Sequence, residues 1–350
     1  MLKIKVNIDK ETYQKLILDM ISFKIIKKDN TPNKNKFMNL LFINYYEEYN
    51  EEINQLINQI NDASKKYKIK NNDFINDIVF NILTKTNKSL TTYYSESLTF
   101  YFSKENEFIF NTINANLSAS TYFRRLIECY LKLPQYKREQ IIFKQNYLII
   151  NNAIKNHQTI KIKLDNNEIL INPYKIGPSK EELFSYLLGV NNNYPLSIHL
   201  SKIKTIVTLK DTFTLTKEIK NHLDLILNLG IQFPFKNICK AEIILNNQGE
   251  KKFKAKYLNR PTPVKIEDNH YYFECSFEQL FTYFASFGEN MKIISPDYLA
   301  KSIYKLYKDI SMNMKISPIK DLFHYKLSNT NSIIIYNIRN YFDISGFYII

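Results

Sequence analysis

The residues best suited to contact nucleic acid lie in two short segments where polar and apolar residues alternate. Lys3, Lys5 and Asn7 are the polar members of the first segment, and Thr99 and Tyr101 are those of the second. Lysine, asparagine and threonine side chains can meet the acceptors and donors on base edges, and a two-stranded ribbon fits the major groove. We therefore expect these five side chains to bind DNA.

The alternation predicts two half-buried strands, because successive side chains of a strand point to opposite faces. The apolar members form the inward face: Ile4 and Val6 in the first strand, and Leu98, Phe100 and Phe102 in the second. A lone strand leaves its backbone donors and acceptors unpaired, so we expect the two strands to pair as an antiparallel ribbon within one chain. The alternative is that both strands only cover a helical core and touch no nucleic acid.

Each predicted strand is followed by two predicted helices, which is the order of a ribbon-helix-helix motif. After the second strand, Ser103 and Ser118 can cap the two helices. The first copy is looser, since Asp9 can cap its first helix but a connector over 23–33 precedes its second. The N-termini of the second helices, near Lys36 and Ser118, present backbone N–H groups that can bind phosphates.

A second group of candidates combines an aromatic ring with positive charge. Tyr186 and Lys202 together suit a single-stranded nucleic acid, because the ring can stack on a base and the ammonium can attract a phosphate. His199 and Lys163 lie on neighbouring predicted strands. Each residue also has an ordinary interpretation: Tyr186 as a core aromatic, the lysines as solvated strand faces, and His199 as a surface histidine.

The residues around this second group follow a recognisable order between Tyr147 and Val207. The order is a helix ending at Ala153 and Ile154, an alternating strand with Ile160, Ile162 and Leu164, an apolar run into Asn172-Pro173-Tyr174, then Tyr186-Leu187 and His199-x-x-Lys202-Ile203. It resembles the WYL domain, a small barrel of bacterial regulators that senses nucleic-acid or nucleotide ligands. The resemblance implies an Sm/SH3-like β-barrel whose groove binds a phosphate-bearing ligand through Tyr186, Lys202, His199 and Lys163.

Several positions depart from the pattern of that family. The tract over 199–203 replaces one that is usually rich in arginine, and Lys163 stands where the family often has tyrosine. Ser185 stands at the position of the tryptophan of the naming motif. Lys202 stands where the family usually has arginine, so the charge is kept but the planar fork that grips a phosphate with two hydrogen bonds is lost.

The C-terminal part has its own order of elements. Runs at 241–245 and 271–275 predict strands, and a helix around 278–287 is closed by Gly288. A short apolar strand, a proline and a last helix follow. This order resembles the extension that often follows WYL domains and commonly mediates dimerisation, so the resemblance implies a homodimer.

Together these features predict a multidomain α+β protein. Residues 1–135 are expected to form a helical region with two ribbon-helix-helix-like motifs, and 136–215 the WYL-like barrel with its lead-in helix. Residues 216–310 are expected to form the C-terminal α/β extension, and 311–350 match no pattern.

Composition favours a polyanionic partner. The chain has 48 Lys+Arg against 34 Asp+Glu, which gives a formal net charge of +14 and attracts nucleic acid. The alternative is that biased codon usage enriched lysine without creating any binding site.

The three cysteines lack C-x-x-C spacing, which fits a reducing cytoplasm, and no run reaches the ~18 apolar residues of a membrane-spanning helix.

No pattern of an enzyme is present. The sequence lacks the glycine-rich phosphate loops, the H-E-x-x-H motif and the G-x-S-x-G motif, and its five histidines have no metal-ligand spacing. We therefore predict no catalytic residues, no cofactor and no metal site.

Three functions follow as hypotheses. The first is a cytoplasmic bacterial transcriptional regulator that binds duplex DNA, senses its ligand through the WYL-like barrel and pairs as a homodimer. The alternative is an accessory protein that binds single-stranded RNA and stimulates an RNA-targeting type VI CRISPR nuclease, which some WYL proteins with such an N-terminal region resemble. Single-stranded DNA is a further possible partner, and a purely structural interaction protein is a third hypothesis. In the regulator, the helical lead over 136–157 would connect ligand binding to the DNA-binding region.

Overall fold

The computed structural model describes residues 2–65, 72–84, 95–113, 118–165 and 167–313. Over these residues the chain is a mixed α and β protein with eleven α-helices and three antiparallel sheets. It divides into two compact units. Unit 1 comprises the residues up to Pro178 together with 182–187 and 198–212, and unit 2 comprises 179–181, 188–197 and the described residues from Phe213 onward. Within the described ranges, no helix is both long and apolar enough to cross a membrane.

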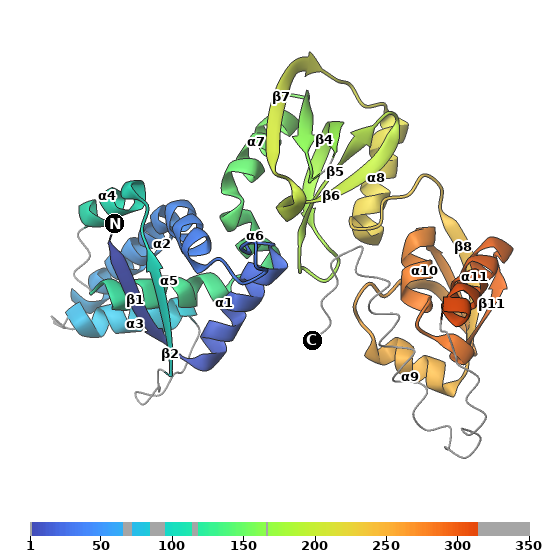
Figure 1. Ribbon diagram of the computed structural model, residues 1–350, viewed down its shortest axis with the longest axis horizontal. Coiled ribbons are helices and arrows are strands. Elements are labelled where there is room, and N and C mark those ends of the chain that lie inside the picture. The colour runs from blue at the N-terminus through green and yellow to red at the C-terminus, as the bar shows by residue number, and fades with distance from the viewer. Residues whose placement is uncertain (1, 66–71, 85–94, 114–117, 166, 314–350) are drawn as a thin grey trace. The chain divides into compact units, whose positions relative to one another are not determined.

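The two alternating segments form a ribbon inside one chain, as predicted. β1 (Lys3–Ile8) pairs antiparallel with β2 (Glu96–Tyr101), with Lys5 opposite Thr99. The burial pattern alternates along both strands, because one face of the ribbon packs on helices α2 (Lys34–Lys65) and α5 (Ala119–Lys132) (Figure 1). The buried face consists of Ile4, Val6, Ile8, Leu98 and Phe100.

The helices next to the ribbon begin at the predicted caps. Asp9 caps α1 (Lys10–Ser22), Ser103 caps α4 (Lys104–Thr112) and Ser118 caps α5, each by accepting a backbone N–H in the first turn. α2 is longer than expected, because the predicted second helix and much of the segment after it form one continuous helix. α3 (Asn72–Thr84) completes this group.

Aromatic rings fill the space between the ribbon and the helices. The rings of Phe42 and Phe102 lie 5.1 Å apart and those of Phe100 and Phe123 lie 5.4 Å apart, between ring centroids. All four side chains are fully buried. Because each ring removes a large apolar area from water, this cluster fixes how the ribbon lies on α2 and α5.

The predicted lead-in helix is two helices. α6 (Gln135–Ile142) ends at Phe143, and α7 (Lys144–Lys155) starts directly after it. Phe143 has φ −106° and ψ 33°, outside the helical range, so the chain changes direction there.

The central sheet has five strands in the order β6-β5-β4-β3-β7. The strands are β3 (Gln158–Lys163), β4 (Glu168–Pro178), β5 (Ser185–Asn191), β6 (Tyr194–His199) and β7 (Thr205–Thr212), with the short 3₁₀ helix η1 (Leu200–Lys202) between the last two. β6 and β7 are the edges, so the described residues form no closed barrel, in contrast to the barrel expected from the sequence. Pro195 lies in β6 and has no backbone N–H to donate, which suits an edge strand.

Unit 2 contains the third sheet, with strand order β11-β8-β10-β9. Its strands are β8 (Cys239–Leu245), β9 (Pro263–Glu267), β10 (His270–Cys275) and β11 (Met291–Ser295). Its helices are α8 (Lys217–Gly230), α9 (Asn247–Ala255), α10 (Phe277–Phe284), α11 (Asp297–Asn313) and the 3₁₀ turn η2 (Gly288–Asn290). The predicted strands at 241–245, 271–275 and 291–295 are present, whereas α9 and β9 had no sequence prediction. From residue 314 onward, the unassigned tail lies outside the described residues.

Candidate nucleic-acid interface

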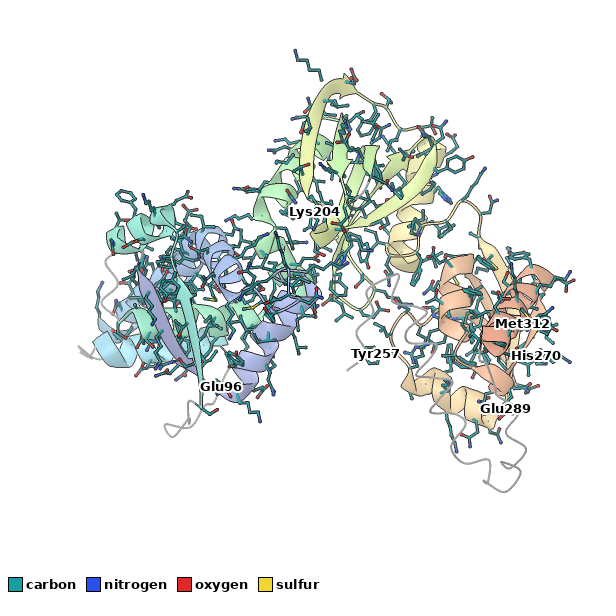
Figure 2. All side chains as sticks on the ribbon, in the orientation of Figure 1. Glu96, Lys204, Tyr257, His270, Glu289 and Met312 are labelled. Atoms are coloured by element: carbon teal, nitrogen blue, oxygen red, sulfur yellow. The ribbon has the colours of Figure 1, made fainter. Side chains whose placement is uncertain are left out.

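The outer face of the ribbon carries the five residues predicted to bind DNA. Lys3 lies opposite Tyr101, and Lys5 lies opposite Thr99, with Asn7 next along β1. Their side chains are exposed or half-buried, on the face opposite the aromatic core. Two of the five are charged, and Glu96 lies at the start of β2 at one end of the ribbon (Figure 2). The face is therefore polar and modestly basic.

Helix side chains complete the hydrogen bonding of the ribbon ends. Asn39 of α2 donates to the carbonyl of Tyr101 at 2.9 Å, and Asn35 accepts the N–H of the same residue at 3.2 Å. At the other strand, Nε of Arg124 donates to the carbonyl of Asn7 at 2.9 Å. These bonds fix the two strands on α2 and α5 and hold the outer face in one orientation.

The two helix N-termini expected to bind phosphates already have side-chain partners. The N–H of Lys36 donates to Oδ1 of Asn33 at 3.1 Å, and that of Thr121 donates to Oγ of Ser118 at 3.2 Å. A phosphate could bind only the remaining N–H groups of each first turn.

Glu139 anchors α6 to the segment that contains the second candidate group. Its side chain has no exposed surface. Oε2 accepts the backbone N–H of Ser185 at 2.7 Å, and Oε1 accepts that of Ser201 at 3.0 Å. Nε2 of His199 lies 2.9 Å from Oε1, but the angles between the imidazole and the carboxylate are not those of a hydrogen bond. One carboxylate therefore joins α6 to the start of β5 and to η1.

Ser185, at the tryptophan position of the family pattern, is buried and hydrogen-bonded. Its Oγ donates to the carbonyl of Tyr136 at 3.1 Å and accepts from Nε2 of Gln140 at 3.0 Å. The small hydroxyl thus holds β5 against α6, and a bulky ring would break these bonds.

The structure brings Tyr186 and His199 together. Their rings stack with centroids 5.2 Å apart and an interplanar angle of 24°, and Phe184 meets the imidazole edge-on at 4.5 Å. Nδ1 of His199 also lies 3.3 Å from Oγ of Ser201. His199 is therefore held by its neighbours and positions the half-buried ring of Tyr186.

Lys202 lies at the end of η1 in a group of charged residues. Burial lowers its pKa, and the positive charge of Lys24 adds to this effect, while Asp165 opposes it. Lys204, which is labelled in Figure 2, lies between η1 and β7. It pairs with Asp165 at 3.3 Å. Lys24 and Asp165 both act on Lys202, and Lys204 pairs with Asp165, so three lysines and one carboxylate leave a net positive charge that would attract an anion. We call Lys24, Lys202, Lys204 and Asp165 the η1 cluster.

Lys163 is close to the η1 cluster along the sheet. It ends β3, opposite Glu168 of β4 and Thr205 of β7, and its carbonyl accepts the N–H of Lys204 at 2.9 Å. Its side chain is exposed. The four predicted ligand-binding residues therefore fall into a stacked pair, Tyr186 with His199, and a basic pair, Lys202 with Lys163.

Sequence reasoning missed Glu139 and Lys24. Glu139 follows Lys137-Arg138 in a charged run, which is typical of a solvated helix face, so residue type gave no sign of its burial. Lys24 lies in the connector after α1, with φ 55°, far in sequence from Lys202. No local pattern could have joined the two lysines.

The comparisons with known proteins concern the fold. The sequence matches no protein-family model and no curated protein. Among solved structures, the chain is similar to the crystal structure of a CRISPR Cas-related protein, with a TM-score of 0.62 and 15% identity over 89% of this chain and 94% of that chain. An alignment with the proteasome accessory factor B/C (PafBC) of Arthrobacter aurescens covers 90% of this chain and 50% of that chain at 9% identity, and its TM-score of 0.23 is too low to indicate a shared fold.

Proposed function

We propose that this chain is an accessory protein of a CRISPR system that binds single-stranded RNA through unit 1 and stimulates an RNA-targeting type VI nuclease. The observation that carries the proposal is the η1 cluster, three lysines with one carboxylate, whose Lys202 lies three residues after His199, the residue that stacks with Tyr186. Positive charge and aromatic rings together bind single strands by attraction to phosphates and by stacking on bases. The formal charge of +14 supports the same class of partner.

The fold supports the CRISPR context of the proposal. The CRISPR Cas-related protein and this chain have similar folds over nearly the full length of both. In this proposal, 136–215 is a WYL-like module and the paired ribbon is a ribbon-helix-helix-like element. Both assignments rest on the order of elements along the chain, and the open sheet replaces the closed barrel of the family pattern.

Helix α6 provides a path from RNA binding to the ribbon region. Its consecutive residues Arg138 and Glu139 contact different parts of unit 1. Nε of Arg138 donates to Oδ2 of Asp19 in α1 at 2.7 Å, and Glu139 holds Ser185 and Ser201. RNA that shifts η1 would therefore move α6 and, through Asp19, the helix that follows β1. Such coupling requires two arrangements of unit 1 that bind RNA with different affinity.

The test is a comparison of affinities for labelled single-stranded RNA, single-stranded DNA and duplex DNA, measured by fluorescence anisotropy over a range of salt concentrations. We expect RNA to bind most tightly and Lys24→Ala/Lys202→Ala to reduce its affinity about tenfold or more, with a shallower salt dependence by roughly 0.7 per lysine. Lys301→Ala/Lys305→Ala, which removes two exposed lysines of α11, is the matched control. Equal RNA affinity in both double variants would refute the proposed site.

A second arm tests the accessory role. Target-RNA cleavage by a type VI nuclease is measured with and without the protein, and then with Lys24→Ala/Lys202→Ala. We expect stimulation by the wild type and its loss in the variant. Unchanged cleavage in the presence of a protein that binds RNA would refute the accessory role and leave RNA binding standing.

The transcriptional regulator is the second candidate function, and the exposed polar face of the ribbon favours it. Lys3, Lys5, Asn7 and Thr99 lie on the exposed to half-buried face of a two-stranded ribbon of the kind that enters the major groove. In this case Lys3→Ala/Lys5→Ala would weaken duplex DNA binding, and the η1 variants would not. The same titrations separate the two functions.

We also propose a homodimer without enzymatic activity that works in the cytoplasm. Unit 2 offers the edge strand β9, where Val264 is 62% exposed and Ile266 is 52% exposed. A second copy of this strand would pair with its unused backbone groups and cover both side chains. Light scattering should give the mass of a dimer for the wild type and of a monomer for Val264→Lys/Ile266→Lys.

A further inference from the structure

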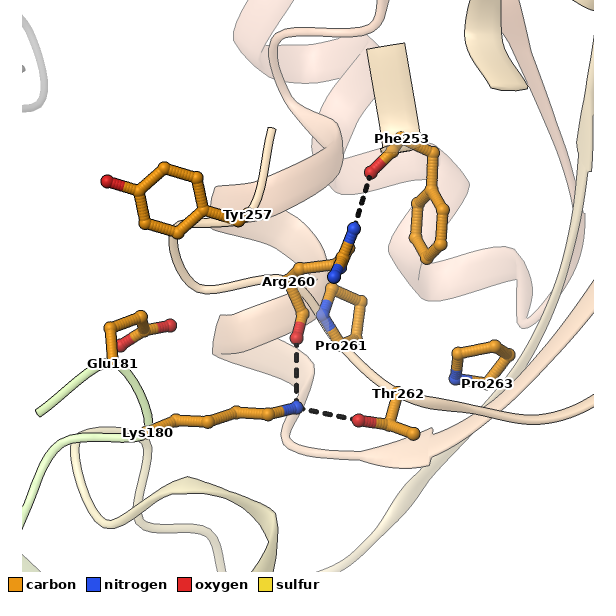
Figure 3. A pocket seen from close by; sticks show the side chains of 8 residues that line it. All are labelled: Lys180, Glu181, Phe253, Tyr257, Arg260, Pro261, Thr262 and Pro263. Atoms are coloured by element: carbon orange, nitrogen blue, oxygen red, sulfur yellow. Dashed lines mark hydrogen bonds between the residues drawn. The ribbon is translucent and has the colours of Figure 1, made fainter. Parts of the chain in front are cut away.

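A pocket in unit 2 is lined by residues that belong to neither candidate group of unit 1. Its volume is about 540 Å³, within the range of roughly 300–1,000 Å³ typical of small-ligand sites. The loop before β5 supplies Lys180 and Glu181, and α9 supplies Phe253. The other walls come from the segment between α9 and β9 and from the first residue of β9, namely Tyr257, Arg260, Pro261, Thr262 and Pro263 (Figure 3).

Lys180 and Arg260 line this pocket, and each has hydrogen-bond donors left for a ligand. Nζ of Lys180 donates to the carbonyl of Arg260 at 3.2 Å and to Oγ1 of Thr262 at 2.6 Å, which leaves one of its three protons (Figure 3). Nη1 of Arg260 donates to the carbonyls of Phe253 and Lys254. Within the described part of the chain, Nε and Nη2 of Arg260 have no hydrogen-bond acceptor.

The charges of the pocket are unbalanced. Burial lowers the pKa of Lys180, Glu181 opposes that effect, and the neighbouring Arg260 reinforces it. Both carboxylate oxygens of Glu181 are used elsewhere: Oε1 accepts the N–H of Asn259 at 2.7 Å, and Oε2 accepts Nε2 of Gln232 at 3.1 Å. An anion between Lys180 and Arg260 would satisfy their remaining donors and relieve their repulsion.

The walls of the pocket are held in place before any ligand binds. The Glu181 bonds fix the loop before β5 on Asn259 and Gln232, and the backbone N–H of Lys180 donates to Gln232 at 3.3 Å. Pro261 and Pro263 restrict the backbone of the opposite wall. Such preorganisation lowers the entropy cost of binding a ligand.

An aromatic platform stands at the same pocket. Tyr257 lines the pocket and is 68% exposed, so its ring is accessible to a ligand. It lies three residues before Arg260 in the same turn, where the N–H of Arg260 donates to its carbonyl at 3.2 Å. An exposed ring beside two cations suits a planar base attached to a phosphate.

We propose that this pocket binds a nucleoside phosphate, with the phosphate on Lys180 and Arg260 and the base stacked on Tyr257. The site belongs to unit 2 and does not depend on RNA binding by unit 1. Its ligand is either a free mononucleotide or the phosphorylated end of a strand, because both present the same two groups.

Calorimetric titration of the full chain tests the site with AMP, GMP, CMP and UMP, with inorganic phosphate, and with adenosine. We expect at least one mononucleotide to bind more tightly than phosphate or adenosine, since only the nucleotide uses both the cations and the ring. Lys180→Gln and Tyr257→Ala should each weaken this binding about tenfold. Lys251→Ala, which removes an exposed lysine of α9 outside the pocket, should bind like the wild type.

Titration with a 5′-phosphorylated trinucleotide distinguishes a free mononucleotide from a strand end as the ligand. If it binds the wild type and loses affinity in the Tyr257→Ala variant, the ligand is a strand end, and if only mononucleotides do so, it is a free nucleotide. The inference is overturned if no mononucleotide binds with a Kd below about 1 mM. It is equally overturned if Lys180→Gln and Tyr257→Ala bind as the Lys251→Ala control does, with melting temperatures near that of the wild type. Either failure leaves the RNA affinity of unit 1 untouched, so the two proposals fail separately.

Discussion

Oε2 of Glu139 accepts the backbone N–H of Ser185 at 2.7 Å in a fully buried setting. The same carboxylate also accepts the N–H of Ser201, and His199 lies 2.9 Å from it. A carboxylate without exposed surface is tolerated only when its lone pairs are satisfied, and here backbone groups of two separate segments satisfy them. Glu139 therefore determines how α6 meets β5 and η1.

The first prediction concerns this carboxylate. Glu139→Ala leaves two buried N–H groups without an acceptor, so we expect a loss of about 3–5 kcal/mol in the free energy of unfolding, measured by urea denaturation. Glu139→Gln keeps one acceptor oxygen and should cost less, about 1–3 kcal/mol. If Glu139→Ala costs under ~1 kcal/mol, the carboxylate is not what joins these segments.

A second prediction concerns the pair formed by Arg138 and Asp19. The two side chains make two parallel hydrogen bonds, of 2.7 and 2.8 Å, and both are largely buried. Burial raises the pKa of Asp19 against the opposing effect of Arg138, so this carboxylate depends on its partner. Arg138→Met should therefore destabilise the protein by about 3–5 kcal/mol.

The double variant Asp19→Leu/Arg138→Met provides the control for that prediction. Two apolar side chains leave no unpaired buried charge, so the double variant should regain most of the stability that Arg138→Met loses. A double variant as unstable as the sum of both single variants would show that the two residues do not act as a pair.

The sequence predicted the elements whose signal is local. The ribbon strands could be predicted because Lys3, Lys5 and Asn7 alternate with residues that are buried in the core. This alternation marks a strand whichever residues of the partner strand it pairs with. Ser103 and Ser118 were recognised as caps because capping depends on a side chain and the first turn that follows it. The buried and exposed faces of the ribbon followed from the same patterns.

Features that depend on contacts distant in sequence escaped prediction. The barrel expected from the WYL-like order would need β6 and β7 to join, and nothing local encodes that pairing, although Pro195 marks β6 as an edge. Glu139 gave no local sign of burial, because its burial depends on η1, far along the chain. The grouping of Lys24 with Lys202 likewise exists only in the folded unit.

A third prediction uses the half-buried Lys256 of unit 2. Its Nζ donates to the carbonyl of Tyr283 and to Oγ of Ser286, both at 3.0 Å, and burial lowers its pKa to about 8. The unfolded chain keeps this lysine protonated up to its ordinary pKa near 10.4, so between about pH 8 and 10 the unfolded state binds more protons. The contribution of Lys256 to stability must therefore rise with pH in this window.

The measurement compares the wild type with Lys256→Met by urea unfolding at pH 7 and pH 9.5. We expect the stability of the wild type relative to the variant to increase by roughly 1–3 kcal/mol between these values. Lys251→Met, at an exposed position of α9, should show no such change. A difference between wild type and Lys256→Met that stays constant with pH would contradict the lowered pKa.

The last prediction joins the electrostatics of η1 to the proposed RNA binding. Burial and the charge of Lys24 lower the pKa of Lys202, so this lysine loses its proton at a lower pH than an exposed lysine does. Between pH 7 and pH 9.5, Lys202 should therefore lose more charge than an exposed lysine does, and RNA affinity should fall with it. Lys202→Arg stays charged throughout because the guanidinium does not deprotonate in this range, so its RNA affinity should remain nearly constant. Anisotropy titrations at both pH values decide the matter: an equal decline in wild type and Lys202→Arg would mean that Lys202 does not hold the RNA phosphate.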